Sequence, residues 1–179
     1  DALHTIVENG NGEVLLGGYG SGFSKWDGTT MEKMSETNTF PLILPGAFSY
    51  KKNQVLFFSD GVENGIKILQ DGKVKQIKPT FNSLNRPRNK TIRADYFTGY
   101  FIDTLKNGNL AFGLARRGLG LLQKWGKDSL EVKLISDAQG MKLINVLHFQ
   151  QDKEERIWMG RTSKGMSLYD PVLDTAYTW

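Results

Sequence analysis

The stretch ERIWMGRTSKGMSLYDP, residues 155–171, decides the fold because its spacing returns elsewhere in the chain. Residues 12–28, GEVLLGGYGSGFSKWDG, match it without a gap, and Leu15 stands in the place of Trp158. Each copy combines a short apolar run, a glycine turn and an aromatic-aspartate end. One feature that recurs at this spacing predicts a repeated structural unit.

Two looser copies, with a longer turn, occupy residues 53–72 and 108–126. The second glycine of each copy marks the period, at Gly22, Gly65, Gly120 and Gly165. These glycines lie 43, 55 and 45 residues apart, and the long interval holds residues 82–93, which we expect to be a loop insertion. A period of about 40–45 residues built from short strands is typical of β-propeller blades.

Short apolar runs between Gly, Asn and Asp predict strands rather than helices. Gly22 and Gly165 are expected to start strands after hairpin turns, because glycine adopts positive φ without a steric clash. We therefore predict an all-β chain of four antiparallel, four-stranded units. Their expected boundaries are residues 1–45, 46–95, 96–140 and 141–179. Trp158 and Trp26 are expected to be buried, as large side chains that fill space between adjacent sheets.

The ends of the chain favour an arc over a closed ring of four blades. The first residue is Asp rather than Met, and neither end carries half a blade. We expect an arc of a larger propeller, of about seven blades. An arc leaves apolar blade faces uncovered, so we expect self-association near residues 3–6 and 144–149, around a two-fold axis.

Composition excludes several classes of protein. The 179 residues are 39% hydrophobic, which suits a folded chain, and no run approaches the roughly 18 apolar residues of a membrane span. The net charge of +4 is modest, so no nucleic-acid partner is expected. The chain has no cysteine, which excludes thiol chemistry, and no motif for a cofactor.

Ligand-binding candidates lie in the turns between the two halves of each copy, since propellers bind ligands through loops. Arginine can grip a carboxylate or sulfate with two hydrogen bonds, and a tyrosine ring can stack on a sugar. The alternative is that these turns are solvated hairpin tips. The candidate residues are Tyr19, Asp60, Asn64, Arg116, Arg117, Arg161 and Lys164.

Catalytic and metal sites are not predicted. His4 and His148 are the only histidines, they do not align between repeats, and a metal site needs three or four convergent ligands. The alternative is a propeller lyase or lactonase that uses residues beside the inner strands. That reading would employ Glu8, Asp103, His148 and Asp152.

The fourth unit resembles the two-component regulator propeller repeat. The matching residues are Asp152, Trp158, Gly160, Gly165, Tyr169 and Asp170. Glu155 replaces a glycine of that repeat, Arg161 a threonine and Met166 a leucine. The first unit is similar to it through Gly12, Gly17, Gly22, Phe23 and Asp27.

The resemblance implies the periplasmic ectodomain of an inner-membrane hybrid two-component sensor. Propellers of that family detect oligosaccharides and signal to a histidine kinase and phosphorelay, which would lie outside this chain. Its partners would be an oligosaccharide and the rest of the parent sensor. Because fold does not determine function, a structural or protein-interaction propeller array remains the alternative.

Overall fold

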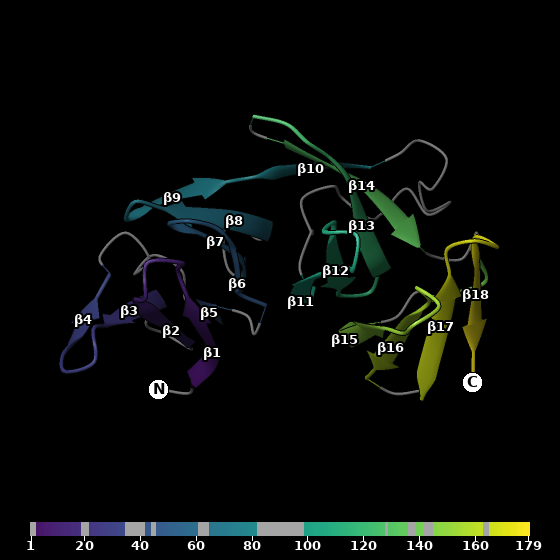
Figure 1. Cartoon of the computed structure of the whole chain (residues 1–179), viewed down its shortest axis with the longest axis horizontal. Helices are drawn as coiled ribbons and strands as arrows, with labels where there is room; N and C mark the ends of the chain where they lie inside the picture. Colours follow the sequence, from purple (N-terminus) through teal and green to yellow (C-terminus); the bar gives the residue numbers. More distant parts are fainter. Residues whose placement is uncertain are drawn as a thin grey trace. The chain divides into compact units, whose positions relative to one another are not determined.

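The computed structural model describes residues 3–18, 22–34, 42–43, 46–60, 65–81, 99–127, 129–135, 139–141, 145–162 and 165–179 (Figure 1). The side chains of residues 42–43, 59–60 and 81 are not described. Three predicted site residues, Tyr19, Asn64 and Lys164, lie outside the described residues, as does the expected loop insertion at 82–93.

The prediction of an all-β chain made of antiparallel sheets is confirmed, and Figure 1 shows four of them. Blade 1 contains β1 (Leu3–Glu8), β2 (Val14–Gly18), β3 (Gly22–Trp26) and β4 (Met31–Lys33). Blade 2 contains β5 (Leu42–Ile43), β6 (Phe48–Lys51), β7 (Gln54–Asp60), β8 (Gly65–Gln70) and β9 (Lys73–Gln76). Blade 3 contains β10 (Lys78–Phe81), β11 (Gly99–Thr104), β12 (Leu110–Leu114), β13 (Gly118–Trp125) and β14 (Ser129–Ile135). Blade 4 contains β15 (Val146–Gln151), β16 (Ile157–Arg161), β17 (Met166–Asp170) and β18 (Thr175–Thr178).

Two blades carry a fifth strand. In blade 2, β5 and β6 both pair with β7, at its opposite ends. In blade 3, β10 joins the outer edge of the meander and pairs with β14, so residues 78–81 belong to the third sheet rather than to the second. The chain divides into two compact units, Asp1–Lys78 and Pro79–Trp179, and each is described by itself.

The first hairpin has the same construction in blades 1, 3 and 4. One residue of the first strand is bulged in each, between Leu3 and Thr5, Gly99 and Phe101, and Val146 and His148. The turn that follows is closed by the same backbone hydrogen bond, from Asn9 to Glu13, Leu105 to Asn109, and Asp152 to Arg156. These shared features allow residues of different blades to be compared position by position.

The backbone corrects the prediction that Gly120 is the turn glycine of the third copy. Gly118, not Gly120, takes a positive φ of 83° at the start of its strand, as Gly22 does with 63°, and Gly165 takes 71° immediately before β17. Gly120 lies within β13, where a Cβ would come 3.0 Å from the Val132 side chain. The third turn is therefore as short as the first, and the second is the long one.

Each unit has one apolar seam between its two blades. In unit 1 the seam joins Val7, Leu15 and Phe23 of blade 1 to Val55, Phe57 and Leu69 of blade 2. The Phe23 and Phe57 rings meet edge to face, with centroids 5.0 Å apart. In unit 2 the seam joins Ala111, Leu119, Ile135 and the nearby Met141 to Val146, Phe149, Ile157, Met159, Tyr169 and Ala176 of blade 4. We call the side that a blade turns toward the following blade its forward face, and the opposite side its backward face.

The expected burial of the two tryptophans is wrong for Trp26, which is 42% exposed, while Trp158 is half-buried. Trp26 lies on the backward face of blade 1, opposite the seam with blade 2. Trp158 lies on the forward face of blade 4 and donates its indole N–H to the Asp152 carboxylate at 2.8 Å. The ring is thus anchored by a hydrogen bond rather than enclosed between sheets.

Candidate functional site

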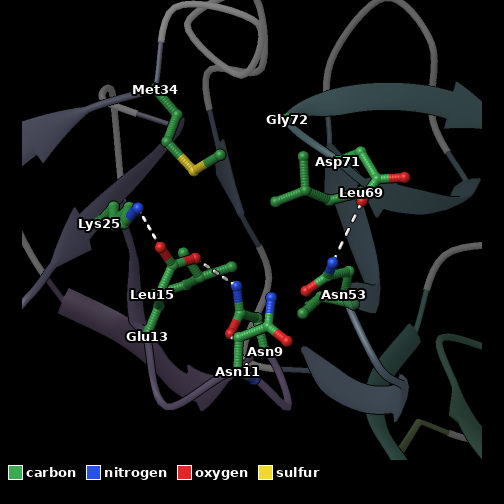
Figure 2. Close-up of a pocket in the computed structure, with 11 residues that line it drawn as sticks. Asn9, Asn11, Glu13, Leu15, Lys25, Met34, Asn53, Leu69, Asp71 and Gly72 are labelled. Carbon is green, nitrogen blue, oxygen red and sulfur yellow. Dashed lines mark hydrogen bonds and ion pairs between the residues drawn. The ribbon is translucent and has the colours of Figure 1, made fainter.

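A hollow of about 220 Å³ opens at one end of the seam in unit 1 (Figure 2). It lies where the β1–β2 turn of blade 1 meets the β6–β7 and β8–β9 turns of blade 2. The apolar part of its lining comes from the last residues of the seam and from the residue after β4. These are Leu15, Val55, Leu69 and Met34.

The blade 1 side of the rim is a charged network. Glu13 forms an ion pair with Lys25 and accepts a hydrogen bond of 2.6 Å from the Asn9 amide. The hydrogen bond from Lys25, followed by that from Asn9, lowers the pKa of the Glu13 carboxyl. The same pair raises the pKa of Lys25. The rim therefore presents a carboxylate and an ammonium side by side at neutral pH.

The blade 2 side is built from two turns held in left-handed conformations. Asn53 has a φ of 60°, and Asp71 and Gly72 form a two-residue turn with φ of 48° and 76°. Such a turn suits a hairpin because positive φ at both residues matches the strand twist. The Asn53 amide donates to Asp71 at 3.3 Å, and its backbone N–H donates to the Asn9 carbonyl at 3.0 Å. The two blades are thereby linked at the edge of the hollow.

The side-chain oxygen of Asn53 is buried and accepts no hydrogen bond within the described part of the chain. In Figure 2 this oxygen points away from Asp71, toward the hollow. Buried acceptors cost free energy unless a donor reaches them. A hydroxyl or N–H group bound in the hollow would supply that donor.

This lining can bind one small polar molecule, or one residue of a longer one. Amides, a carboxylate and an ammonium provide both donors and acceptors, and the apolar side chains provide a dry floor. The volume falls below the roughly 300–1,000 Å³ usual for drug-sized ligands. None of the described side chains that line the hollow is aromatic.

Of the predicted loop residues that the structure describes, Arg116 and Arg117 lie in the turn between β12 and β13, and Asp60 and Arg161 are the last residues of β7 and β16. Arg116 is exposed, with a φ of 57°, and its backbone N–H donates to Asn145 at 2.7 Å. Arg117 is only 5% exposed, and burial lowers the pKa of its guanidinium. Arg161, 9% exposed, donates to the Trp179 carbonyl at 3.0 Å. The backbone of Asp60 pairs with Leu42, and its side chain is not described.

Two of the four residues named for the lyase or lactonase alternative line a common hollow. Asp103 and His148 line one shallow hollow in unit 2, and the His148 ring lies 4.2 Å from that of Phe101. The Asp152 carboxylate is engaged by Arg156 and Trp158, and Glu8 accepts a hydrogen bond from the Gly12 N–H. Within the described ranges, no three His, Cys, Asp or Glu side chains gather as metal ligands.

The hollow of unit 1 was missed from the sequence. Its polar residues, Asn9, Asn53 and the Asp71-Gly72 pair, are all typical turn formers. Nothing in their local pattern shows that three turns from two blades meet at one place. The signal that was present is the concentration of asparagine and glycine at these turns.

Comparisons with known proteins support the fold. No protein-family model matches the chain, and no curated protein matches it. Among solved structures, the extracellular domain of the proposed one-component system BT4673 from B. thetaiotaomicron is 13% identical, with a TM-score of 0.72 over 98% of this chain. That of the proposed hybrid two-component system BT3049, also from B. thetaiotaomicron, is 16% identical, with a TM-score of 0.61 over 96%. The WD40 β-propeller domain of Doa1 is 15% identical, with a TM-score of 0.55 over 89%.

These matches confirm β-propeller blades. The chain spans 24% and 21% of the length of the two extracellular domains, and 47% of the Doa1 chain. Within the described residues, no helix has the length and apolar character needed to cross a membrane.

Proposed function

We propose that this chain is a segment of the ligand-sensing propeller of a hybrid two-component sensor. The likeness to two ectodomains of such systems, over nearly the whole chain, supports this role. The sensor would detect an oligosaccharide on the periplasmic side of the inner membrane. Signalling would pass to a histidine kinase and phosphorelay outside this chain.

We place one sugar residue of that ligand in the hollow of unit 1. The observation that supports this placement is the buried side-chain oxygen of Asn53. Glu13 and Lys25 line the same hollow. One sugar hydroxyl can donate to that oxygen, and another hydroxyl of the same sugar can accept from the Lys25 ammonium on the opposite side of the hollow (Figure 2). The predicted loop residues remain a second candidate surface, and Arg116 is the exposed cation among those described.

Binding of neutral and acidic oligosaccharides, measured by calorimetry, tests the site. Asn53→Gly keeps the left-handed backbone and removes the amide, so we expect at least tenfold weaker binding. Asn107→Gly, in a turn of unit 2 outside the hollow, is the matched control and should bind as the wild type does. Equal binding by Asn53→Gly would exclude the hollow. Loss on Arg116→Ala instead would favour the loop surface.

We also propose that the chain has no catalytic activity of its own. Of the acidic residues named for the alternative, only Asp103 lines the same hollow as His148, and the described residues hold no cluster of three metal-ligating side chains. Turnover of a lactone, glycoside or polyuronate by the purified chain, abolished by His148→Ala, would overturn this proposal.

A further inference from the structure

The floor of the hollow in unit 1 suits a small methyl-bearing group. An aromatic ring would offer the flat surface on which a sugar ring stacks, but none of the described lining residues is aromatic. The floor is built instead from the aliphatic side chains of Leu15, Val55, Leu69 and Met34. A methyl group gains dispersion contacts from several such side chains at once. The floor therefore fits a substituent of a sugar better than the sugar ring itself.

The unpaired acceptor of the hollow lies beside this floor. Val55 pairs with Leu69 across the β7–β8 hairpin, and Asn53 and Asp71 lie two residues beyond this pair, at the same end of the strands. Since a strand rises about 3.3 Å per residue, the polar pair and the apolar pair are about 7 Å apart. The Asn53 amide nitrogen donates to Asp71 at 3.3 Å, so the buried oxygen is left to accept from a ligand. A ligand with a donor next to a methyl group can reach both.

The charges at the rim favour a neutral ligand. Glu13 and Asp71 contribute two carboxylates, and Lys25 contributes the one ammonium among the described lining residues. Lys25 already forms an ion pair with Glu13. An acidic sugar would have to displace Glu13 and would also meet the Asp71 carboxylate, and like charges brought together cost free energy. An uncharged carbonyl can instead accept from Lys25 without displacing Glu13, because an ammonium has three donors.

We propose that the hollow binds the acetamido group of a 2-acetamido sugar, an inference that rests on the oligosaccharide-sensing role proposed above. The amide N–H donates to the side-chain oxygen of Asn53, and the amide carbonyl accepts from the Lys25 ammonium. The methyl group packs against the apolar floor. The sugar ring stays at the mouth of the hollow, with the rest of the oligosaccharide outside it.

The geometry of a trans amide matches the arrangement of these partners. Its N–H and C=O point in opposite directions, and its methyl group points away from the sugar carbon that carries the nitrogen. Figure 2 shows Lys25 and Asn53 on opposite sides of the hollow, with the side chains of Met34 and Leu69 between them in this view. One acetamido group thus meets a donor, an acceptor and the floor in a single pose. A hydroxyl can donate to Asn53, but it brings no methyl group to the floor.

Sugars that differ only at carbon 2 test the proposal. Ligand-observed NMR titrations of the wild-type chain compare the methyl glycosides of N-acetylglucosamine, glucosamine and glucose, and the galacto and manno series repeat the comparison. In at least one series, we expect the N-acetyl sugar to bind about tenfold more tightly than the other two, from one hydrogen bond and one buried methyl group. Magnetisation transferred from the protein should be strongest at the acetyl methyl protons.

Two variants locate the acetyl group in this hollow. Asn53→Gly removes the acceptor and should abolish most of the preference for the N-acetyl sugar. Met34→Ala enlarges the floor, so the preference should shift from the N-acetyl to the N-propionyl sugar. Met31→Ala, in β4 and outside the lining at 64% exposure, is the control and should keep the wild-type preference. Because the sugar series uses the wild-type chain, it decides the proposal even where a variant fails to fold.

The outcomes that overturn this inference are distinct from those that overturn the sensing role. Equal or tighter binding of the parent hexose or the amino sugar would show that the acetamido group is not recognised. Tighter binding of fucose or rhamnose would assign the floor to the methyl group of a 6-deoxy sugar, and tighter binding of glucuronic acid would contradict the inference from the rim charges. In each of these cases a carbohydrate still binds, so the sensing role stands. If no carbohydrate binds, neutral or acidic, the proposed function itself fails.

Discussion

Leu69 in the seam of unit 1 and Tyr169 in the seam of unit 2 occupy equivalent positions but have different side chains. Leu69 pairs with Val74 across the hairpin, as Tyr169 pairs with Ala176. The Tyr169 hydroxyl donates to Asp174 at 2.7 Å, and Lys133 of blade 3 donates to the same carboxylate at 2.9 Å. Leu69 is shorter and lines the open hollow instead.

Residues at the rim of the hollow in unit 1 are also polar where their counterparts in unit 2 are apolar. Lys25 pairs with Leu15 as Leu121 pairs with Ala111, so the rim ammonium of unit 1 corresponds to an apolar side chain in unit 2. Asn9 corresponds likewise to Leu105, which opens the equivalent turn. The same blade backbone can therefore form a seam that is filled at its end, as in unit 2, or one that opens into a hollow, as in unit 1. Whether a hollow exists depends on a few side chains rather than on the fold.

The largest expected effect is that of Tyr169→Ala. The side chain is 1% exposed, so its loss should leave a cavity, remove one hydrogen bond to Asp174 and lower the free energy of unfolding by about 3–5 kcal/mol. Leu69→Ala should cost about 2 kcal/mol, the low end for such a change, because its site is already open on one side. Chemical denaturation of both variants makes the comparison. Equal losses would contradict the difference between the seams.

Leu69→Tyr should convert the open seam toward the closed one. The added ring can enter the hollow, so we expect oligosaccharide binding to fall at least tenfold while the free energy of unfolding changes by less than about 1.5 kcal/mol. Leu69→Met, which adds no ring, is the control and should retain binding. Undiminished binding by Leu69→Tyr would show that the ligand lies elsewhere.

Glu155 offers a smaller effect in the first hairpin of blade 4. It has a φ of 63°, where blades 1 and 3 have Gly12 and Gly108 at φ of 81° and 80°. A non-glycine residue in this conformation is strained by about 1 kcal/mol. Glu155→Gly should therefore stabilise unit 2 by up to about 1 kcal/mol, and Gly12→Glu should destabilise unit 1 by a similar amount. Thermal unfolding of the two variants checks the opposite signs.

The smallest effect concerns pH. Hydrogen bonds from Lys133 and then Tyr169 lower the pKa of Asp174 in the folded chain. A lowered folded pKa gives stability above the unfolded carboxyl pKa, near 4, that is lost as pH falls through the folded value. The difference in unfolding free energy between wild type and Asp174→Asn should be under about 1 kcal/mol at pH 7, since the pair is partly exposed, and should shrink below pH 4. A difference that grows in acid would contradict this assignment.

Repeat spacing was sufficient to predict the blades because strand length, turn glycines and alternation are local properties. Gly22 and Gly65 start β3 and β8 with positive φ, and Gly165 immediately precedes β17 with positive φ. Spacing alone predicts Gly120 for the third turn, but Gly118 takes the positive φ there, because backbone conformation is what distinguishes a turn glycine from a packing glycine. Trp26 was misjudged because the burial of a blade residue depends on which face has a neighbour. The hollow depends on contacts between blades, which no single repeat encodes.

The extra strand β10 covers the longest and most apolar of the outer blade strands that the structure describes. An exposed edge strand can pair with another chain, and short or lysine-bearing edges discourage this. The outer strands β4 and β9 read MEK and KVKQ, and β18 has only four residues. The outer strand of the blade 3 meander, β14, reads SLEVKLI and is longer and more apolar. It is the one that β10 covers, and Thr80 adds a side-chain hydrogen bond to the Leu130 carbonyl at 3.1 Å. Detachment of this four-residue strand would turn a well-folded blade into a template for amyloid-like stacking.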